Sequence, residues 1–343
     1  MFFTGNQRID CGRRRLLSSL VGTCAIGLVG CDRRQRELVE LPPAQSPVQF
    51  PLSFQRGQRY LSDAVGRPFL IHGDTAWSIV GQLTDADIEL YLDNRQAKGF
   101  NAILFSAPEA YYTSHDPSYH NVDGVAPFSP MPDFAQPNDP YWARVDRIVN
   151  GAKARGIVCM INPAYLGYPG GMDGWAKEVA SASDSQLHAY GVFLANRYTQ
   201  GNIIWCMGGD RDESALIKKQ WNIVSGIRTV RTDDIISAHP LADTVNADDA
   251  YTYWSHASGF SLNAIYGYET SGFFVYSLAT QAYSRPGPVP FLGFEFKYEN
   301  SAGATGMMLR RQSYGSILSG ACGQFFGNLP VWHFGSPRWR NEP

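Results

Sequence analysis

Clustered positive charge is missing from most of this 343-residue chain. The formal net charge is −2, and no block or stripe of like charge occurs beyond the first forty residues. Because contacts to phosphate groups require clustered Lys and Arg side chains, nucleic acid is not an expected partner. Charged residues make up 17% of the chain and hydrophobic residues 44%, which excludes global disorder and allows a sizeable core.

Cysteine is also scarce, and no two cysteines have the spacing of a metal site. Three of the six fall within the first 31 residues. The remaining three, Cys159, Cys206 and Cys322, are an odd number and lie in or beside apolar runs. We therefore expect buried free thiols, with no metal and no other cofactor.

An apolar run near the N-terminus, Leu16–Val29, has 14 residues and follows three arginines. It is too short for a comfortable membrane span but suits the apolar part of a secretory signal. The run ends in Leu-Val-Gly-Cys31, which resembles a bacterial lipobox, whose cysteine carries diacylglycerol. The sequence thus predicts a lipoprotein signal over residues 1–31 with Cys31 as the lipidation site. The alternative is a buried N-terminal helix with an accidental cysteine.

The stretch 32–51 is charged and contains proline, as a flexible tether does, and residues 52–343 then form one folded domain. Acyl chains on Cys31 would hold the exported protein at a membrane of the bacterial cell envelope, on its periplasmic or cell-surface face.

From Phe69 onward, short apolar runs alternate with longer amphipathic ones. Eight runs are continuously apolar, as in parallel strands covered on both faces: Phe69–Gly73, Ala102–Ser106, Val158–Asn162, Ile203–Met207, Ile235–Ala238, Leu262–Tyr266, Pro290–Glu295 and Gly323–Phe326. Helical patterns between them cover Thr84–Lys98, Tyr141–Arg155, Ser185–Tyr198, Glu213–Val230, Gly272–Tyr283 and Thr305–Leu318. This alternation predicts the α/β class and a single (β/α)8 (TIM) barrel.

Two further segments complete the predicted fold. We expect a small hairpin within Gln55–Pro68 at the bottom of the barrel, and a long loop with a short helical piece over Asp243–Ser258. The alternative architecture is a doubly wound open sheet, but no Gly-rich nucleotide loop follows the first strand.

The active site of such a barrel lies at the C-terminal ends of the strands. Asp210 follows strand four and Glu295 ends strand seven, and we expect the two to face each other across the barrel mouth. Glycoside hydrolysis requires two carboxyl groups, about 5 Å apart in retaining enzymes. Gly208 and Gly209 before Asp210 allow the backbone to turn sharply outward.

Each carboxylate also has a structural alternative. Asp210 could cap the helix that begins near Glu213. Glu295 could be a buried ion-pair partner of Arg211 or Lys297.

Several segments together resemble one family. They are Gly73–Trp77 (Gly-Asp-Thr-Ala-Trp), Tyr91–Asn101, Ile204–Asp210 and Glu295–Glu299, and the match spans Tyr60 to His333. They resemble the apiosidase-like glycoside hydrolases, glycoside hydrolase family 140 and its relatives. The resemblance implies a (β/α)8 barrel with Asp210 as acid/base, Glu295 as nucleophile and Glu299 as a residue that positions them.

This chain also departs from that family in two segments that should line the sugar pocket, residues 263–268 and 243–249. The catalytic mechanism of the family can therefore apply to this chain without the same sugar specificity. The candidate substrate-binding residues are Asp74, Trp77, Tyr112, Asn162, Arg211, His239, Tyr266, Tyr298 and Glu299. For Asp74 and Trp77 the alternatives are a structural hydrogen bond and a core tryptophan.

These observations predict an exo-acting, retaining glycoside hydrolase on polysaccharide side chains, cleaving apiosyl or other pentosyl or deoxysugar linkages. The aromatic content of 13% suits a sugar cleft as well as ordinary packing. The alternative function is a non-catalytic, surface-anchored carbohydrate-binding lipoprotein on the same scaffold.

Overall fold

The computed structural model describes residues 47–55, 57–109, 118–169, 174–211, 213–241, 249–256, 259–268, 272–287 and 289–335. The chain divides into two units, residues 1–46 and 47–343, and every described residue belongs to the second. Cys31, the predicted signal and Tyr112 lie outside the described residues. The predicted domain boundaries and the lipidation site therefore remain predictions.

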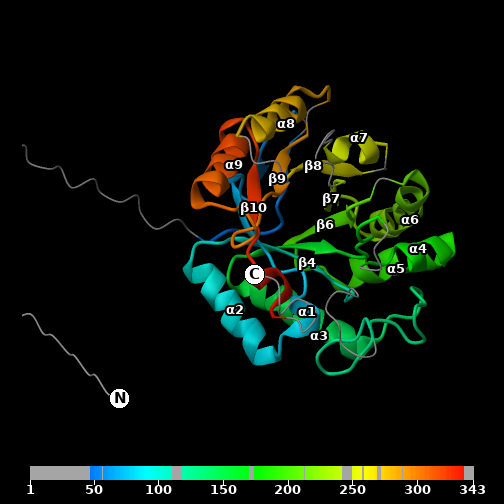
Figure 1. Cartoon of the computed structure of the whole chain (residues 1–343). Helices are drawn as coiled ribbons and strands as arrows, with labels where there is room; N and C mark the ends of the chain where they lie inside the picture. The colour runs from blue at the N-terminus through cyan, green and yellow to red at the C-terminus, as the bar shows by residue number, and fades with distance from the viewer. Residues whose placement is uncertain are drawn as a thin grey trace, which may run out of the picture. The chain divides into compact units, whose positions relative to one another are not determined.

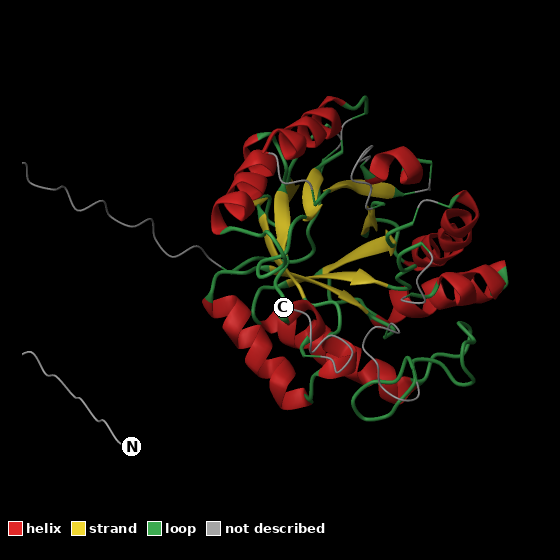
Figure 2. Ribbon diagram, in the orientation of Figure 1, coloured by secondary structure: helices red, strands yellow, loops and turns green. Residues whose placement is uncertain are grey.

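Eight parallel strands form a closed barrel, with each strand beside the next in sequence and the last beside the first (Figures 1 and 2). They are β3 (Ile71–Thr75), β4 (Ala102–Ser106), β5 (Val158–Asn162), β6 (Ile203–Gly208), β7 (Ile235–His239), β8 (Phe260–Tyr266), β9 (Phe291–Glu295) and β10 (Gly323–Phe326). The predicted (β/α)8 barrel is thus confirmed. The first strand begins two residues later than predicted because Phe69 pairs in a separate hairpin.

That hairpin consists of β1 (Leu61–Ser62) and β2 (Pro68–Phe69), which pair antiparallel within the predicted segment. The Arg67 guanidinium and the backbone of Gln49 both donate to the carboxylate of Asp63. Phe50 packs on the core beside them. The described end of the predicted tether, residues 47–51, therefore lies against the barrel.

Helices surround the strands in the figures. The six predicted ones are α2 (Asp85–Ala97), α3 (Asp139–Ala154), α5 (Asp184–Arg197), α6 (Ser214–Val230), α8 (Gly272–Ser284) and α9 (Gly306–Leu318). Shorter ones are α1 (Ile79–Gln82), α4 (Ala176–Ser181), α7 (Ala250–Trp254) and a 3₁₀ turn at Val331–His333. Of these, α7 is the short piece expected in the Asp243–Ser258 loop. The others are too short to show a helical period.

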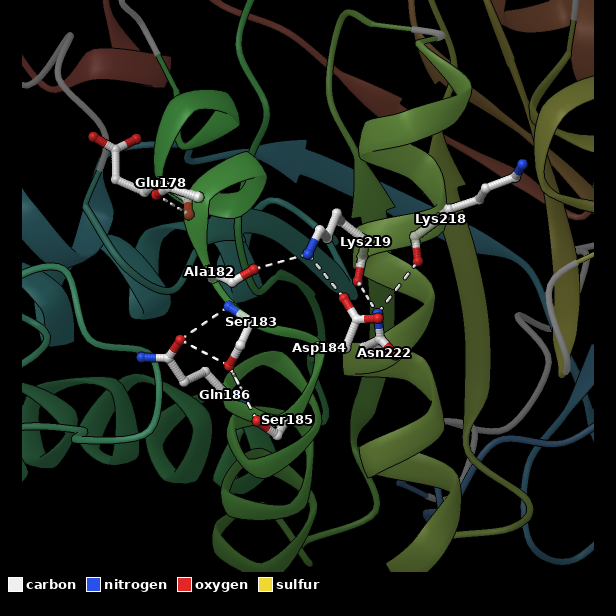
Figure 3. A network of polar contacts seen from close by, with 10 residues as sticks. Glu178, Ala182, Ser183, Asp184, Ser185, Gln186, Lys218, Lys219 and Asn222 are labelled. Atoms are coloured by element: carbon white, nitrogen blue, oxygen red, sulfur yellow. Dashed lines mark hydrogen bonds and ion pairs between the residues drawn. The ribbon is translucent and has the colours of Figure 1, made fainter.

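The start of α5 shows how the sequence fixes a helix end (Figure 3). The Ser183 side chain accepts from the backbone of Gln186, and the Gln186 side chain accepts from the backbone of Ser183, which forms a capping box. From α6, Lys219 Nζ donates to Asp184 Oδ1 at 2.8 Å and to the Ala182 carbonyl at 2.9 Å. The corner between α4 and α5 is thereby fixed to α6.

The core fills the barrel and the layer between strands and helices. It includes four fully buried tryptophans, Trp142, Trp175, Trp205 and Trp254. Cys159, Cys206 and Cys322 are buried free thiols, as predicted, and burial raises the pKa of each. All eight strands and both hydrophobic clusters lie within residues 47–343, so this unit has its own core. Among the described residues, no helix combines the length and apolar character needed to cross a membrane.

Asp74 connects the first barrel strand to its helix. Its side chain is fully buried, accepts a hydrogen bond from Tyr91 Oη at 2.6 Å and lies 3.3 Å from Arg95 Nη1, both on α2. Burial raises the pKa of Asp74 to about 6, although Tyr91 and Arg95 act in the opposite direction. Asp74 is thus a structural residue that joins β3 to α2.

This environment predicts a specific pH dependence of stability. Because the folded-state pKa of Asp74 lies above its ordinary value of 3.8, the folded chain binds more protons than the unfolded chain between pH 4 and 6. The free energy of unfolding should therefore fall as pH rises through this window, by about 3 kcal/mol relative to an Asp74→Asn variant. Urea unfolding of both proteins at several pH values measures the difference. A difference that grows with pH, or stays constant, would contradict the assignment.

Candidate active site

A cavity of about 460 Å³ opens at the C-terminal ends of the barrel strands. It is lined by Trp77, Tyr165, Asp210, His239, Tyr266, Tyr268, Glu295, Lys297, Tyr298, Ser301, Leu329 and Trp332. The two predicted carboxylates share this pocket. They come from the ends of β6 and β9, and the two intervening strands, β7 and β8, end in His239 and Tyr266. In this ring of eight strands β9 is three places from β6, close to the opposite position, so the two carboxylates enter the pocket from well-separated strands.

Two glycines place Asp210 in the pocket. Gly208 has φ +87°, and a Cβ there would lie 2.8 Å from the His239 carbonyl oxygen. A Cβ on Gly209 would lie 2.6 Å from the backbone nitrogen of Leu166. Only glycine therefore allows the end of β6 to turn here while the loop after β5 approaches it closely.

A buried glutamine on α6 connects the end of β6 to the loop after β5 through hydrogen bonds. The backbone N–H of Gly208 donates to Gln220 Oε1 at 2.6 Å, and Gln220 Nε2 donates to the Ala164 carbonyl at 2.6 Å. The same loop carries Tyr165, whose hydroxyl donates to Asp210 Oδ2 at 2.5 Å. The loop after β5 thus delivers a hydrogen bond to the carboxylate at the end of β6.

Asp210 does not cap the following helix. The cap residue of α6 is Glu213, and Asp210 instead lines the pocket, where its Oδ1 is buried without a hydrogen-bond partner among the described atoms. Burial raises the pKa of Asp210, His239 opposes this, and the charge of Glu295 raises it further. The net pKa is above the ordinary value, which favours a carboxyl group that carries a proton.

Glu295 is buried and surrounded by donors. Tyr268 Oη donates to Glu295 Oε1 at 2.5 Å, and His239 Nε2 lies 3.4 Å from Glu295 Oε2. Arg211, a possible partner considered from the sequence, instead forms an ion pair with Glu213 at 2.7 Å. One oxygen of Glu295 therefore accepts from Tyr268, and the other faces His239.

His239 lies between the two carboxyl groups. Its Nδ1 donates to the Pro240 carbonyl at 2.7 Å, since a carbonyl oxygen can only accept. Burial lowers the pKa of His239, but the charges of Asp210 and Glu295 outweigh that effect, and the net pKa is raised. The raised pKa favours an imidazolium whose Nε2–H faces Glu295.

Aromatic side chains form much of the wall. Trp77 Nε1 donates to Tyr298 Oη at 3.1 Å, and the Trp77 ring lies 5.4 Å from that of Tyr165, centroid to centroid. Tyr266 and Tyr268 continue this wall with ring centroids 5.4 Å apart. Flat aromatic faces of this kind suit the apolar C–H faces of sugar rings.

The arrangement brings together a carboxyl group whose pKa is raised by burial and a second carboxyl group held by Tyr268 and His239. Such a pair can protonate a leaving oxygen and attack an anomeric carbon. Among the described residues, no group of three or more His, Cys, Asp or Glu side chains is placed to hold a metal ion.

Six residues predicted from the sequence line the pocket: Asp210, Glu295, Trp77, His239, Tyr266 and Tyr298. Four others do not. Asp74 faces α2, and Asn162 is fully buried, with its Nδ2 donating to the Gly208 carbonyl. Arg211 turns away to the carbonyls of Leu166 and Tyr168.

Glu299 is the fourth residue outside the pocket wall. Its carboxylate accepts a hydrogen bond from Asn328 Nδ2, and its backbone bridges to the same residue. Glu299 therefore links the segments that follow β9 and β10. Tyr112, the remaining candidate, lies outside the described residues.

The sequence-based list omits six lining residues: Tyr165, Tyr268, Lys297, Ser301, Leu329 and Trp332. The first three follow predicted strand ends within a few residues, and this position could have identified them. Ser301 and Leu329 come from irregular loops after β9 and β10, and Trp332 from the 3₁₀ turn at Val331–His333, which is too short for a periodic pattern to indicate which side chains point inward.

Solved structures that resemble this chain are glycoside hydrolases. A glycoside hydrolase family 5 structure from Bacteroides vulgatus superposes with a TM-score of 0.69 at 21% identity, over 84% of this chain and 65% of that one. This chain thus spans slightly less than two thirds of that protein. An endo-1,4-β-mannanase from Rhizomucor miehei gives 0.60 at 9% identity, over 84% and 98% of the two chains. At these identities the likeness shows the fold.

An exo-β-1,4-mannosidase from an Opitutaceae bacterium has a TM-score of 0.58 at 14% identity, over 80% of this chain and 54% of that one. No curated protein sequence matches the chain. The family comparison is more specific, because residues 55–342 match the family described as apiosidase-like, catalytic domain. Because this match covers most of the chain, it shows that the chain belongs to the apiosidase-like glycoside hydrolases.

Proposed function

We propose that this enzyme is a retaining, exo-acting glycoside hydrolase in which Asp210 is the acid/base and Glu295 the nucleophile. The observation that carries the proposal is the pairing of two unlike carboxyl groups in one pocket. Asp210 has a raised pKa, and Glu295 is held by Tyr268 and His239. One group is thus suited to donate a proton and the other to attack.

The reaction proceeds in two steps. In the first, Asp210 gives its proton to the glycosidic oxygen while a Glu295 oxygen bonds to the anomeric carbon, and the alcohol leaves. In the second, Asp210 takes a proton from water, whose oxygen attacks the anomeric carbon and breaks the bond to Glu295. The sugar is released with its original anomeric configuration, and both carboxyl groups regain their starting states.

His239 has a role in both steps. When Glu295 forms the glycosyl ester it loses its negative charge, and at the same moment Asp210 becomes an anion. The His239 imidazolium lies near both groups, so one positive charge remains close to one negative charge throughout. Such fixed compensation avoids reorganisation of water within the pocket.

The pocket dimensions and the family support the substrate class. A cavity of about 460 Å³, with Trp77 and Trp332 in its lining, has the volume of a small-ligand pocket, and in the proposed function it holds the terminal sugar of a branch. The apiosidase-like family favours apiosyl or other pentosyl or deoxysugar linkages on polysaccharide side chains. A carbohydrate-binding lipoprotein without turnover is the alternative, which sugar release by the wild-type enzyme would exclude.

The first prediction concerns the two carboxylates. In a release screen on pectic and arabinan-type polysaccharides, Asp210→Asn and Glu295→Gln should each lower turnover at least ~10³-fold, because each removes one half of the acid and nucleophile pair. Glu299→Gln is the matched control, since it neutralises a nearby carboxylate that does not line the pocket. It should retain turnover within a few-fold of wild type.

Near-wild-type turnover in either pocket variant would remove that residue from the mechanism. Azide added to Glu295→Ala should restore activity by replacing the nucleophile and give a glycosyl azide of opposite anomeric configuration. A glycosyl azide of opposite anomeric configuration from Asp210→Ala, with none formed by Glu295→Ala, would reverse the assigned roles.

A second prediction concerns Tyr165. Its hydrogen bond to the ionised form of Asp210 lowers the pKa of that group. Tyr165→Phe should therefore raise the pKa of Asp210 and move the alkaline limb of the kcat/KM profile to higher pH, since the acid stays protonated longer. Tyr190→Phe is the control, because that hydroxyl bonds the Pro163 carbonyl away from the pocket. An unmoved limb, or a shift to lower pH, would contradict the role of Tyr165.

We also propose that the enzyme is exported and lipid-anchored through Cys31, on the basis of the lipobox-like Leu-Val-Gly-Cys sequence after an apolar run. In a bacterial host, mass spectrometry of the mature N-terminal peptide should find diacylglycerol on Cys31. Cys31→Ser should abolish the modification and release the enzyme from the membrane fraction. An unmodified, uncleaved N-terminus in the wild-type protein would refute the anchor.

A further inference from the structure

The outer surface of α8 and α9 exposes large apolar side chains. The two helices pack side by side on the barrel (Figure 1). Phe273 and Leu318 are each 83% exposed, and Tyr276, Met307 and Tyr314 are more than half exposed. We call these five residues, together with Arg310 and Arg311, the α8–α9 face.

The residues of this face on α8 are different from those through which α8 packs on the barrel. Val275, Leu278, Ala279 and Ala282 are buried and form the second hydrophobic cluster. An open groove of about 540 Å³ runs over the exposed side, lined mainly by Tyr276, Met307, Tyr314, Leu318 and the two arginines. A contiguous exposed apolar patch of this kind marks an interaction surface.

The charge of the face has one sign. Neither α8 nor α9 contains an Asp or Glu residue. Arg310 and Arg311 are exposed, and no ion pair involves either one within the described parts of the chain. Elsewhere arginines are matched with carboxylates, as in Arg144 with Asp85, Arg155 with Glu89, Arg197 with Asp146 and Arg285 with Asp249. The face is thus both apolar and positively charged.

We propose that the α8–α9 face docks on a lipid bilayer containing anionic headgroups. Apolar side chains such as Phe273, Met307 and Leu318 enter the boundary between headgroups and acyl chains, and Arg310 and Arg311 pair with lipid phosphates. A second copy of this chain fits less well. A symmetric contact would bring four arginines together, and the face itself offers no carboxylate to neutralise them.

The start of the folded unit lies near the N-terminal ends of two other strands, with Val48 beside Gly156 before β5 and Pro51 beside Gly201 before β6. The Pro47 carbonyl accepts from Arg67 Nη2 at 2.7 Å, and Arg59 of the same N-terminal segment lies 3.9 Å above the Tyr283 ring of α8. Fifteen residues, 32–46, separate Pro47 from Cys31 and reach at most about 50 Å when extended. The charge and apolar character of the face do not depend on a lipid anchor at Cys31.

Vesicle flotation of residues 47–343, which contain the whole barrel core, tests the proposal without the predicted anchor. The unit should bind phosphatidylcholine vesicles that contain phosphatidylglycerol, and less so as salt rises. Arg310→Gln with Arg311→Gln should weaken this binding roughly 30-fold, since each cation near an anionic surface contributes about 1 kcal/mol, or about a fivefold step in affinity. Phe273→Ser with Leu318→Ser should weaken it as well.

Matched variants separate the face from general charge and apolarity. The variant Lys153→Gln with Lys218→Gln also removes two positive charges, from exposed positions on α3 and α6. The Lys218 side chain extends away from the polar network drawn in Figure 3. This variant should bind vesicles as the wild type does. The variant Val65→Ser with Leu90→Ser removes two exposed apolar side chains outside the α8–α9 face and should also leave vesicle binding unchanged. Circular dichroism confirms that each variant is folded.

Three outcomes would overturn the proposal. They are no dependence of binding on phosphatidylglycerol, equal losses in the face and control variants, and a dimer in sedimentation that Leu318→Ser dissociates. The last would assign the face to a second copy of the chain.

Discussion

Two carboxyl groups that share a pocket repel each other when both are charged, and a buried imidazole lies near both of them in this chain. His239 lies at the end of the strand next to that of Asp210, and its Nε2 faces Glu295. In the proposed reaction only one carboxyl group is negative at a time, and the imidazolium of His239 lies close to that charge in each state. Beside this imidazolium, a proton can leave Asp210 as negative charge leaves Glu295. The proposed chemistry therefore depends on His239 although it need not contact the substrate.

The backbone segments around Asp210, His239 and Glu295 pack closely against one another. Gly208 and Gly209 permit two backbone segments to approach where any Cβ would collide, and Gln220 bonds both segments. The close approach brings the Tyr165 hydroxyl within 2.5 Å of Asp210. The sequence indicates only a turn at Gly208 and Gly209. In the structure these glycines also allow the hydrogen bond from Tyr165 to Asp210, which lowers the pKa of Asp210.

The sequence predicts the barrel well because its strands are buried on both faces and read as continuous apolar runs, and the pocket carboxylates follow from their positions at strand ends. The same feature explains the errors. A strand that is apolar on both faces gives no sign of which strand-end side chain points inward, so Asp74 and Asn162 were equally plausible candidates although both are fully buried in structural contacts. Ser301 lies in an irregular loop and Trp332 in a single 3₁₀ turn, and the course of such segments depends on tertiary packing, which no local pattern encodes.

The central claim is that Glu295 forms a covalent bond to the sugar while Asp210 donates a proton in the first step and accepts one in the second. A 2-deoxy-2-fluoro glycoside of the sugar found in the release screen, carrying a good leaving group, slows the second step more than the first and lets the intermediate accumulate. Peptide mass spectrometry of the inactivated enzyme measures where the sugar is attached. The account predicts one fluoroglycosyl group on the peptide that contains Glu295, esterified at that residue. An adduct on Asp210 or Glu299, or rapid turnover of the probe with inverted anomeric configuration and no adduct, would contradict it.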